Sequence, residues 1–187
     1  MAGLRVIGGS ARGLRLRMVP GDSSRPIGDR VKGALFNILG ADVEGSRFLD
    51  LFAGTGSVGI EALSRGASSA TMIDASPRAI QTIRANLAHT RLEERGEVVH
   101  GDSFAYLART PPEPFDFIYV APPQYHGLWS RALRAIDTNP GALNPDGSVI
   151  AQIHPKEYEA LGLNRLVEKQ QRRYGNTLLC FFELPGT

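Results

Sequence analysis

The sequence predicts an α/β protein built on a mostly parallel sheet, and three observations support this. From residue 47 onward, nearly continuous apolar runs of strand length alternate with segments of helical pattern. A glycine-rich turn follows the first of these strands, and the stretch 163–184 contains two strand-like runs around a turn. Strands buried on both faces have such apolar sequences, so we expect helices on both sides of the sheet and an antiparallel hairpin at one edge.

The chain begins with two short β-type runs, residues 4–9 and 14–19, joined by a turn-like segment. They predict a small basic hairpin ahead of the main domain. Apolar residues at helical spacing then predict a helix over 29–39 with one buried face. We therefore divide the chain into an N-terminal β-hairpin extension, 1–28, and a main domain, 29–187.

The main domain is expected to alternate strands and helices in chain order. The expected strands are 47–52, 70–74, 97–101, 115–120 and 147–153, and the expected helices between them are 57–65, 77–89, 103–109 and 128–137. The pattern contains no internal repeat and no low-complexity segment. A chain of 187 residues is of ordinary single-domain length.

Composition indicates an ordinary globular protein, with 42% hydrophobic and 21% charged residues. No apolar run is long enough to cross a bilayer and no secretory signal is evident, so we expect a cytoplasmic protein without membrane contact. The single cysteine, Cys180, lies in an apolar run and is interpreted as core filler. The four histidines show no paired ligand spacing, so no metal site is expected.

Positive charge is concentrated at the N-terminus. Residues 1–32 contain seven basic and two acidic side chains, although the whole chain has a net charge of only +2. A basic arm on a slightly acidic body suggests contact with a polyanion; a solvated hairpin is the alternative. The candidate RNA-binding residues are Arg5, Arg12, Arg15, Arg17, Arg25 and Arg30.

A glycine-rich turn follows the first strand of the main domain, with Gly54, Gly56 and Gly59 spaced G-x-G-x-x-G. Glycines at a strand-to-helix turn let the backbone approach a ligand closely and leave the amino end of the helix pointing toward it. The spacing alone serves dinucleotides as well as other adenosine-bearing cofactors. The acidic residues near this turn distinguish between these two classes of cofactor.

Acidic residues follow three successive strands: Asp50, Asp74 and Asp102. A negative charge at Asp50 disfavours a pyrophosphate beside the glycine turn and favours a ligand with positive charge, such as S-adenosylmethionine. Asp74 can accept both ribose hydroxyls and Asp102 the adenine amine, although Asp102 could simply cap a helix. The candidate cofactor residues are Asp50, Phe52, Gly54, Gly56, Asp74, Ala75, Asp102 and Ser103.

The run "FDFIYVAPPQY", residues 115–125, ends a buried strand in two prolines and then presents an amide and an aromatic ring. Prolines fix φ and expose carbonyl groups that no helix consumes. Two plainer interpretations stay open. The prolines could simply terminate the strand, and Tyr125 and Trp129 could pack in the core.

Four segments together resemble the bacterial RsmD family, which methylates the exocyclic N2 amine of one guanine in small-subunit ribosomal RNA. They are "RPIGDRVKGALFNIL", "FLDLFAGTGSVGIEALSRGA", "FDFIYVAPPQY" and "RRYGNTLLCFFE", in that order over nearly the whole chain. The resemblance implies a seven-stranded, Rossmann-like class I methyltransferase fold with S-adenosylmethionine as donor. It also implies that the basic hairpin grips small-subunit ribosomal RNA or the assembling 30S subunit. We further expect a monomer.

One departure from the family pattern concerns the acceptor site. The family has Asp-Pro-Pro followed directly by an aromatic residue, whereas this chain has Ala121 in place of the acid and its aromatic residue one position later. An N2 amine is conjugated with its ring and needs oriented hydrogen-bond acceptors before it can attack a methyl group. Backbone carbonyls and the Gln124 amide could supply them while Tyr125 stacks on the base. The candidate catalytic residues are therefore Ala121, Pro122, Pro123, Gln124 and Tyr125.

Three alternatives remain at this point. The chain could bind RNA or cofactor without catalysing transfer, because one positioned acceptor is worth about a hundredfold to a thousandfold in rate. It could methylate another amine. A nicotinamide-dependent oxidoreductase would explain the glycines and Asp74 but would leave Asp50 and the Pro-Pro segment without a role.

Overall fold

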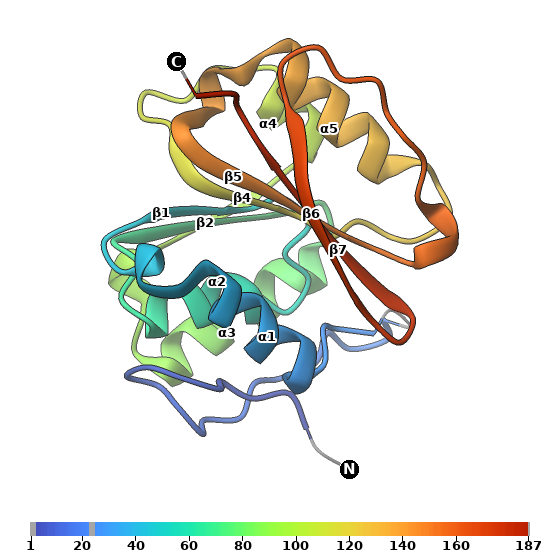
Figure 1. The fold of residues 1–187 in the computed structure, drawn as a ribbon. Coiled ribbons are helices and arrows are strands. Elements are labelled where there is room, and N and C mark those ends of the chain that lie inside the picture. The colour runs from blue at the N-terminus through green and yellow to red at the C-terminus, as the bar shows by residue number, and fades with distance from the viewer. Residues whose placement is uncertain (1–2, 23–24, 187) are drawn as a thin grey trace.

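The structure, a computed structural model, describes residues 3–22 and 25–186. Its centre is a seven-stranded sheet with helices on both faces (Figure 1). The strands are β1 Arg47–Asp50, β2 Ser69–Asp74, β3 Gly96–His100, β4 Phe115–Val120, β5 Leu143–Ile153, β6 Val167–Tyr174 and β7 Thr177–Glu183. The α-helices are α1 Asp29–Leu39, α2 Ser57–Ser64, α3 Pro77–Thr90, α4 Ser103–Leu107 and α5 Leu128–Thr138. Short 3-10 helices are η1 Gly40–Val43, η2 Glu93–Arg95, η3 Pro140–Ala142 and η4 Pro155–Glu157.

The strand order is β3-β2-β1-β4-β5-β7-β6, which confirms the predicted fold. The first five strands run parallel, and β7 inserts antiparallel between β5 and the edge strand β6. Because the carboxyl ends of parallel strands share one edge, the loops after β1, β2, β3 and β4 lie at the same edge of the sheet. Every predicted cofactor and acceptor residue lies at the end of one of these strands, in the loop after it, or at the start of the next helix.

Several predicted boundaries differ from the structure, most of them by one residue. Strand β5 begins at Leu143 rather than at 147. The first strand ends at Asp50 rather than at 52, because the chain turns there into the glycine loop. Helix α4 ends at Leu107 rather than at 109, and the Thr-Pro-Pro sequence that follows disfavours a helical conformation at the residue before each proline. Helix α1 covers the predicted residues, 29–39.

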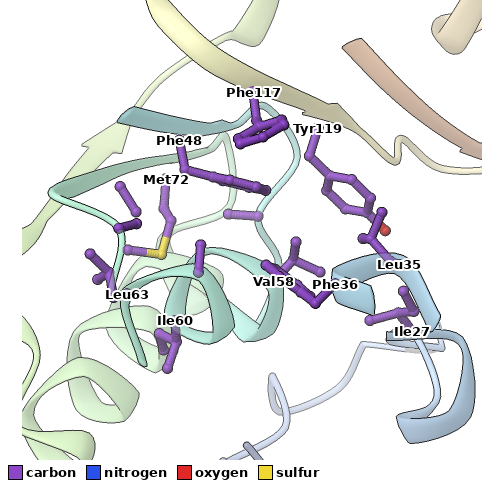
Figure 2. Packing of buried hydrophobic residues seen from close by; sticks show 14 of the residues in the cluster. Ile27, Leu35, Phe36, Phe48, Val58, Ile60, Leu63, Met72, Phe117 and Tyr119 are labelled. Carbon is purple, nitrogen blue, oxygen red and sulfur yellow. The ribbon is translucent and has the colours of Figure 1, made fainter. Parts of the chain in front are cut away.

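The sheet divides the core into two apolar clusters. Helices α1, α2 and α3 cover one face, and α4 and α5 cover the other (Figure 1). Alternation along the strands supplies both clusters, since Phe48 faces the first and its neighbour Leu49 the second. Figure 2 shows Phe48 and Phe117 pointing from the sheet toward Phe36 of α1, with the rings of Phe36 and Phe48 6.1 Å apart.

The N-terminal hairpin is present in a minimal form. A single antiparallel bridge joins Arg5 and Arg15, flanked by backbone hydrogen bonds between residues 4–6 and 13–16. Leu4, Val6 and Leu16 are buried in the same apolar cluster as α2 and α3. The hairpin is therefore held mainly by packing onto the main domain, and the division at residue 28 stays a prediction.

Within residues 3–22 and 25–186, no helix is long and apolar enough to cross a membrane.

Candidate functional site

The glycine loop joins β1 to α2 and has two residues in the left-handed region. Gly54 has φ 56° and Gly56 has φ 80°, conformations that L side chains rarely adopt. A Cβ added to Gly54 would meet no atom of the described chain within 4 Å, so this side of the loop is open. Gly59 has a different role, because a Cβ there would lie 2.7 Å from Met72 of β2. The first two glycines therefore shape the turn, and the third allows close contact of α2 with the sheet.

Hydrogen bonds connect the ends of neighbouring strands at this edge. The backbone amide of Gly54 donates to the Asp74 carboxylate at 2.9 Å, and the amide of Gly101 donates to the Asp74 carbonyl at 3.0 Å. The buried hydroxyl of Ser103 donates to the carbonyl of Leu51. The structure thus brings the predicted cofactor residues after β1, β2 and β3 into one connected group.

Asp50 is the most perturbed acid of this group. Its side chain is 1% exposed, and its Oδ1 atom has no hydrogen-bond partner among the described residues. Burial, the larger cause, and the negative charge of Asp74 together raise the pKa of Asp50 to about 7. Backbone amides of Gly59 and Phe52 lower the pKa but offset only part of the rise. A buried carboxylate with a free oxygen is suited to a cationic ligand group.

Asp102 caps helix α4. Its carboxylate accepts hydrogen bonds from the amides of Phe104 and Ala105, both at 3.3 Å. The capping role weighed from the sequence is therefore real, while the exposed side chain keeps lone pairs that can accept from a ligand. The Phe52 ring meets the Phe104 ring edge-on at 6.0 Å between centroids, next to this cap.

Ala75, the residue after Asp74, is exposed, and its carbonyl lies 3.0 Å from the Nε2 atom of His100. The Asp74 carboxylate also accepts from the amide of Ser76 at 2.9 Å. Both oxygens of Asp74 therefore have a backbone donor, which fixes the direction of the carboxylate at the end of β2. Orientation of this kind is what recognition of a ribose would require.

The Pro-Pro turn begins directly after β4. Ala121 is half-buried and Pro122 is buried, whereas Pro123, Gln124 and Tyr125 are exposed. Tyr125 is 62% exposed, so it does not pack in the core. Core packing was also the alternative interpretation for Trp129, and this residue is buried in the cluster beneath α5.

The arginines of the predicted basic arm are exposed. Leu4, Val6 and Leu16 face the core, while Arg12, Arg15, Arg17, Arg25 and Arg30 are exposed. Arg5 differs from the others because its guanidinium pairs with Asp29 at 2.9 Å. Leu4, Val6 and Leu16 of the arm thus pack on the domain, while its exposed side chains include arginines together with Leu14 and Met18.

Sequence reasoning missed a buried ion cluster beneath the arm. Lys32 of α1 and Glu61 of α2 are both fully buried and lie 3.2 Å apart. The Glu61 carboxylate accepts from the amides of Ile7 and Gly8, each at 2.9 Å, and from Arg65 at 2.8 Å. Burial lowers the pKa of Lys32, and the charge of Glu61 opposes this shift. A lysine on the apolar stripe of the predicted helix was the available signal.

Asn86 of α3 was also missed, and it links the arm to the glycine loop. Its Oδ1 accepts from the amide of Arg17 at 2.7 Å, and its Nδ2 donates to the carbonyls of Arg17 at 3.1 Å and Thr55 at 2.9 Å. The residue is fully buried. An asparagine on the buried face of a helix is a signal for such a link, because a buried amide requires partners.

The strand order, the antiparallel β7 and the glycine loop together define a class I methyltransferase fold. Two solved structures agree with it. The chain superposes with a TM-score of 0.87 at 28% identity on "Putative methyltransferase yhhF" from Escherichia coli, covering all of both chains. It superposes with a TM-score of 0.82 at 26% identity on a "putative methylase" from Haemophilus influenzae, covering 98% of this chain and 99% of the other.

The family is shown by sequence as well. The model described as "Conserved hypothetical protein 95" matches residues 4–183, and the chain belongs to this family, which is the RsmD family. The chain is 36% identical over 186 residues to "Putative rRNA methyltransferase YlbH" of Bacillus subtilis, covering 98% of this chain and all of the relative. It is 35% identical to "Ribosomal RNA small subunit methyltransferase D" of Escherichia coli, covering 73% of this chain and 68% of the relative.

Proposed function

We propose that this chain transfers a methyl group from S-adenosylmethionine to the exocyclic N2 amine of a guanine in small-subunit ribosomal RNA. The observation that carries the proposal is the pairing of two sites at one edge of the sheet, the glycine loop with its carboxylates and the exposed Tyr125 after β4. The names of the relatives in Bacillus subtilis and Escherichia coli support ribosomal RNA as the substrate.

The donor site fits S-adenosylmethionine in its charge and in the groups that it offers for hydrogen bonds. Asp50 offers a buried carboxylate oxygen that has no partner among the described residues, which suits the cationic groups of this cofactor. Asp74 offers an oriented carboxylate for the ribose hydroxyls, and the open side of Gly54 allows close approach. A nicotinamide dinucleotide would put its pyrophosphate beside the negative charge of Asp50, so this ligand is disfavoured.

When bound, S-adenosylmethionine supplies a methyl group attached to a positively charged sulfur atom. The protein's task is then to hold the amine in line with that group and to orient the amine hydrogens. We assign the second task to the carbonyls of Ala121 and Pro122, which follow the last residue of β4, and to the exposed Gln124 amide. Tyr125 stacks on the base, and the proton leaves after transfer without a dedicated base.

The basic face of the arm is proposed to hold the RNA backbone. Exposed arginines of the hairpin supply sequence-independent attraction to phosphate, with Arg12, Arg15 and Arg17 near the bridge. Binding would then weaken with rising salt. Exposed Arg25 and Arg30 extend the same charge toward α1.

The test combines cofactor binding with methyl incorporation. The purified protein is titrated with S-adenosylhomocysteine and with NADH by calorimetry, and it is incubated with tritiated S-adenosylmethionine and undermethylated small subunits. We expect binding of the first ligand only and label in the RNA, on guanine N2 after nucleoside digestion. Tight binding without label would indicate a binding protein, and label on another base would refute the guanine assignment.

Tyr125→Ala separates stacking from structure. The variant is expected to lower RNA methylation by about tenfold or more, because base stacking on an aromatic ring is worth ~1–3 kcal/mol. Affinity for S-adenosylhomocysteine should change by less than about twofold, since the ring is exposed and separate from the glycine loop. Equal losses of both would show that Tyr125 supports the fold.

A further inference from the structure

Tyr125 has an unusual backbone conformation for an exposed aromatic residue. Its φ is 66°, and the only other positive-φ residue besides glycine in the described chain is Arg91, which ends helix α3. A left-handed conformation is unfavourable for a bulky side chain and persists only where neighbouring groups hold it. Tyr125 is 62% exposed, so packing of its own ring in the core cannot provide that force.

Glu157, at the end of η4 after β5, is the group that holds this conformation. Its Oε1 accepts from the backbone amide of Tyr125 at 2.6 Å, a bond between residues 32 positions apart. Its Oε2 accepts from the amide of His154 at 3.0 Å, which closes the first turn of η4 as a capping box. One carboxylate therefore ties the turn after β4 to the end of β5.

The His154 ring completes the arrangement. It lies beside the Tyr125 ring, with centroids 5.7 Å apart and planes inclined by 39°. Its Nδ1 accepts from the amide of Lys156 at 3.1 Å, so the orientation of the imidazole is fixed by its own loop. The side chain of Tyr125 thus has a neighbour on one side, while most of its surface remains open.

We propose that Glu157 is a positioning residue for the acceptor site: it holds the Tyr125 amide and so presents the exposed ring to the target base, with His154 as a lateral support. The inference rests on the proposed function and deepens it. It assigns to β5 and η4 a part of the acceptor site for which the sequence suggested only the Pro-Pro turn.

The proposal also gives a physical reason for the extra residue in this chain. Gln124 lies between the prolines and the aromatic residue. Side chains alternate along an extended segment, so in an extended chain this shift of one position would point the ring away from the side that it faces in the family pattern. A left-handed residue reverses the local direction of the backbone. The carboxylate of Glu157 stabilises this reversal, and the shifted aromatic residue can serve in place of one that follows the prolines directly.

The experiment compares Glu157→Ala and Glu157→Gln with Glu159→Ala, an exposed carboxylate two residues further along. For each variant, kcat and KM for undermethylated small subunits, affinity for S-adenosylhomocysteine and the thermal midpoint are measured. We expect Glu157→Ala to lower kcat/KM about tenfold, the factor expected from releasing one residue from the left-handed region. Cofactor affinity should stay within about twofold, and Glu159→Ala should behave as the wild type.

Glu157→Gln provides the rescue. Its amide oxygen can still accept from the Tyr125 amide, although its NH2 group cannot accept from the His154 amide. The variant should therefore recover most of the activity that Glu157→Ala loses. A fall in thermal midpoint without recovery would indicate a purely structural residue and overturn the proposal.

A double-mutant cycle with Tyr125→Ala decides whether Glu157 acts through Tyr125. If it does, Glu157→Ala causes little further loss of kcat/KM when the ring is already absent; additive losses would overturn the proposal. If the proposed function is wrong, the measurements give a different result. In that case the wild type itself would methylate no small subunits, while the effect of Glu157→Ala on the Tyr125 amide proton in NMR spectra would still report whether the carboxylate holds the turn.

Discussion

Replacing Asp50 with asparagine should make the ligand-free protein more stable at high pH and a weaker binder of its cofactor. Burial raises the pKa of Asp50 to about 7, against an ordinary value of 3.8. The folded protein therefore keeps a proton on Asp50 that the unfolded chain has released, over the window between about pH 4 and pH 7. Stability from this group is lost as the pH rises through the window and does not return above it.

The magnitude follows from the two pKa values. One pKa unit corresponds to about 1.4 kcal/mol, so an ionised Asp50 at pH 8 costs the fold about 4 kcal/mol relative to a residue that does not titrate. At pH 5 the carboxyl group of Asp50 is protonated in the folded protein, so the free-energy cost to the fold is about 3 kcal/mol smaller than at pH 8. An asparagine has a constant cost of ~1–3 kcal/mol for its buried amide, which cancels when the two pH values are compared.

The assay is urea unfolding of the wild type and of Asp50→Asn at pH 5 and pH 8 without ligand, with Asp42→Asn as the control at an exposed position. We expect the stability of Asp50→Asn relative to the wild type to rise by about 3 kcal/mol between the two pH values. Asp42→Asn should show no such rise. A constant difference for Asp50→Asn would refute the assignment of a raised pKa to Asp50.

The same substitution, Asp50→Asn, should weaken cofactor binding. Loss of the Asp50 charge removes a charged hydrogen bond worth ~1.5–3 kcal/mol, so affinity for S-adenosylhomocysteine should fall at least about tenfold at pH 8. In the wild type, binding of the positively charged ammonium group of S-adenosylhomocysteine below pH 7 should release protons, which calorimetry in buffers of different ionisation enthalpy detects. Unchanged affinity in the variant would show that the ligand does not use Asp50.

Three further changes test the packing that supports the site. Glu61→Ala leaves buried Lys32 without its carboxylate and should cost ~3–5 kcal/mol in urea unfolding, more than replacement of both residues by apolar ones. Asn86→Ala should cost ~1–3 kcal/mol and speed protease cleavage within residues 3–22, which it bonds. Gly59→Ala should cost ~1–3 kcal/mol because its Cβ would lie 2.7 Å from Met72.

The control variants replace exposed residues; Gln81 lies on the same helix as Asn86, and Ala75 and Glu93 lie outside α2. Glu93→Ala, Gln81→Ala and Ala75→Gly replace exposed residues and should each stay within about 0.5 kcal/mol of the wild type. A stable Glu61→Ala variant would mean that the hydrogen bonds of Lys32 to the Arg5 carbonyl and the Ser57 hydroxyl are sufficient, or that Lys32 loses its proton at little cost. Unchanged proteolysis in Asn86→Ala would show that apolar packing alone holds the N-terminal arm.

Local patterns in the sequence predicted the fold and indicated that the candidate cofactor residues would lie at one edge of the sheet. Alternating apolar runs and helical stripes predicted the sheet and its helices, because burial on both faces of a parallel sheet leaves that pattern in the chain. The glycine spacing and the acids after successive strands predicted where Asp50 and Asp74 would meet, because parallel strands end at one edge. These relations depend on order along the chain and need no knowledge of distant contacts.

Only the tertiary structure brought together residues that no local pattern connects. Glu61 meets Ile7 and Lys32, Asn86 meets Arg17, and Glu157 meets Tyr125, in each case across 29 or more positions of the chain. Nothing near Tyr125 in the sequence indicates a left-handed backbone held by a carboxylate. Such contacts depend on how whole elements pack in the folded chain, so no local pattern of residues can indicate them.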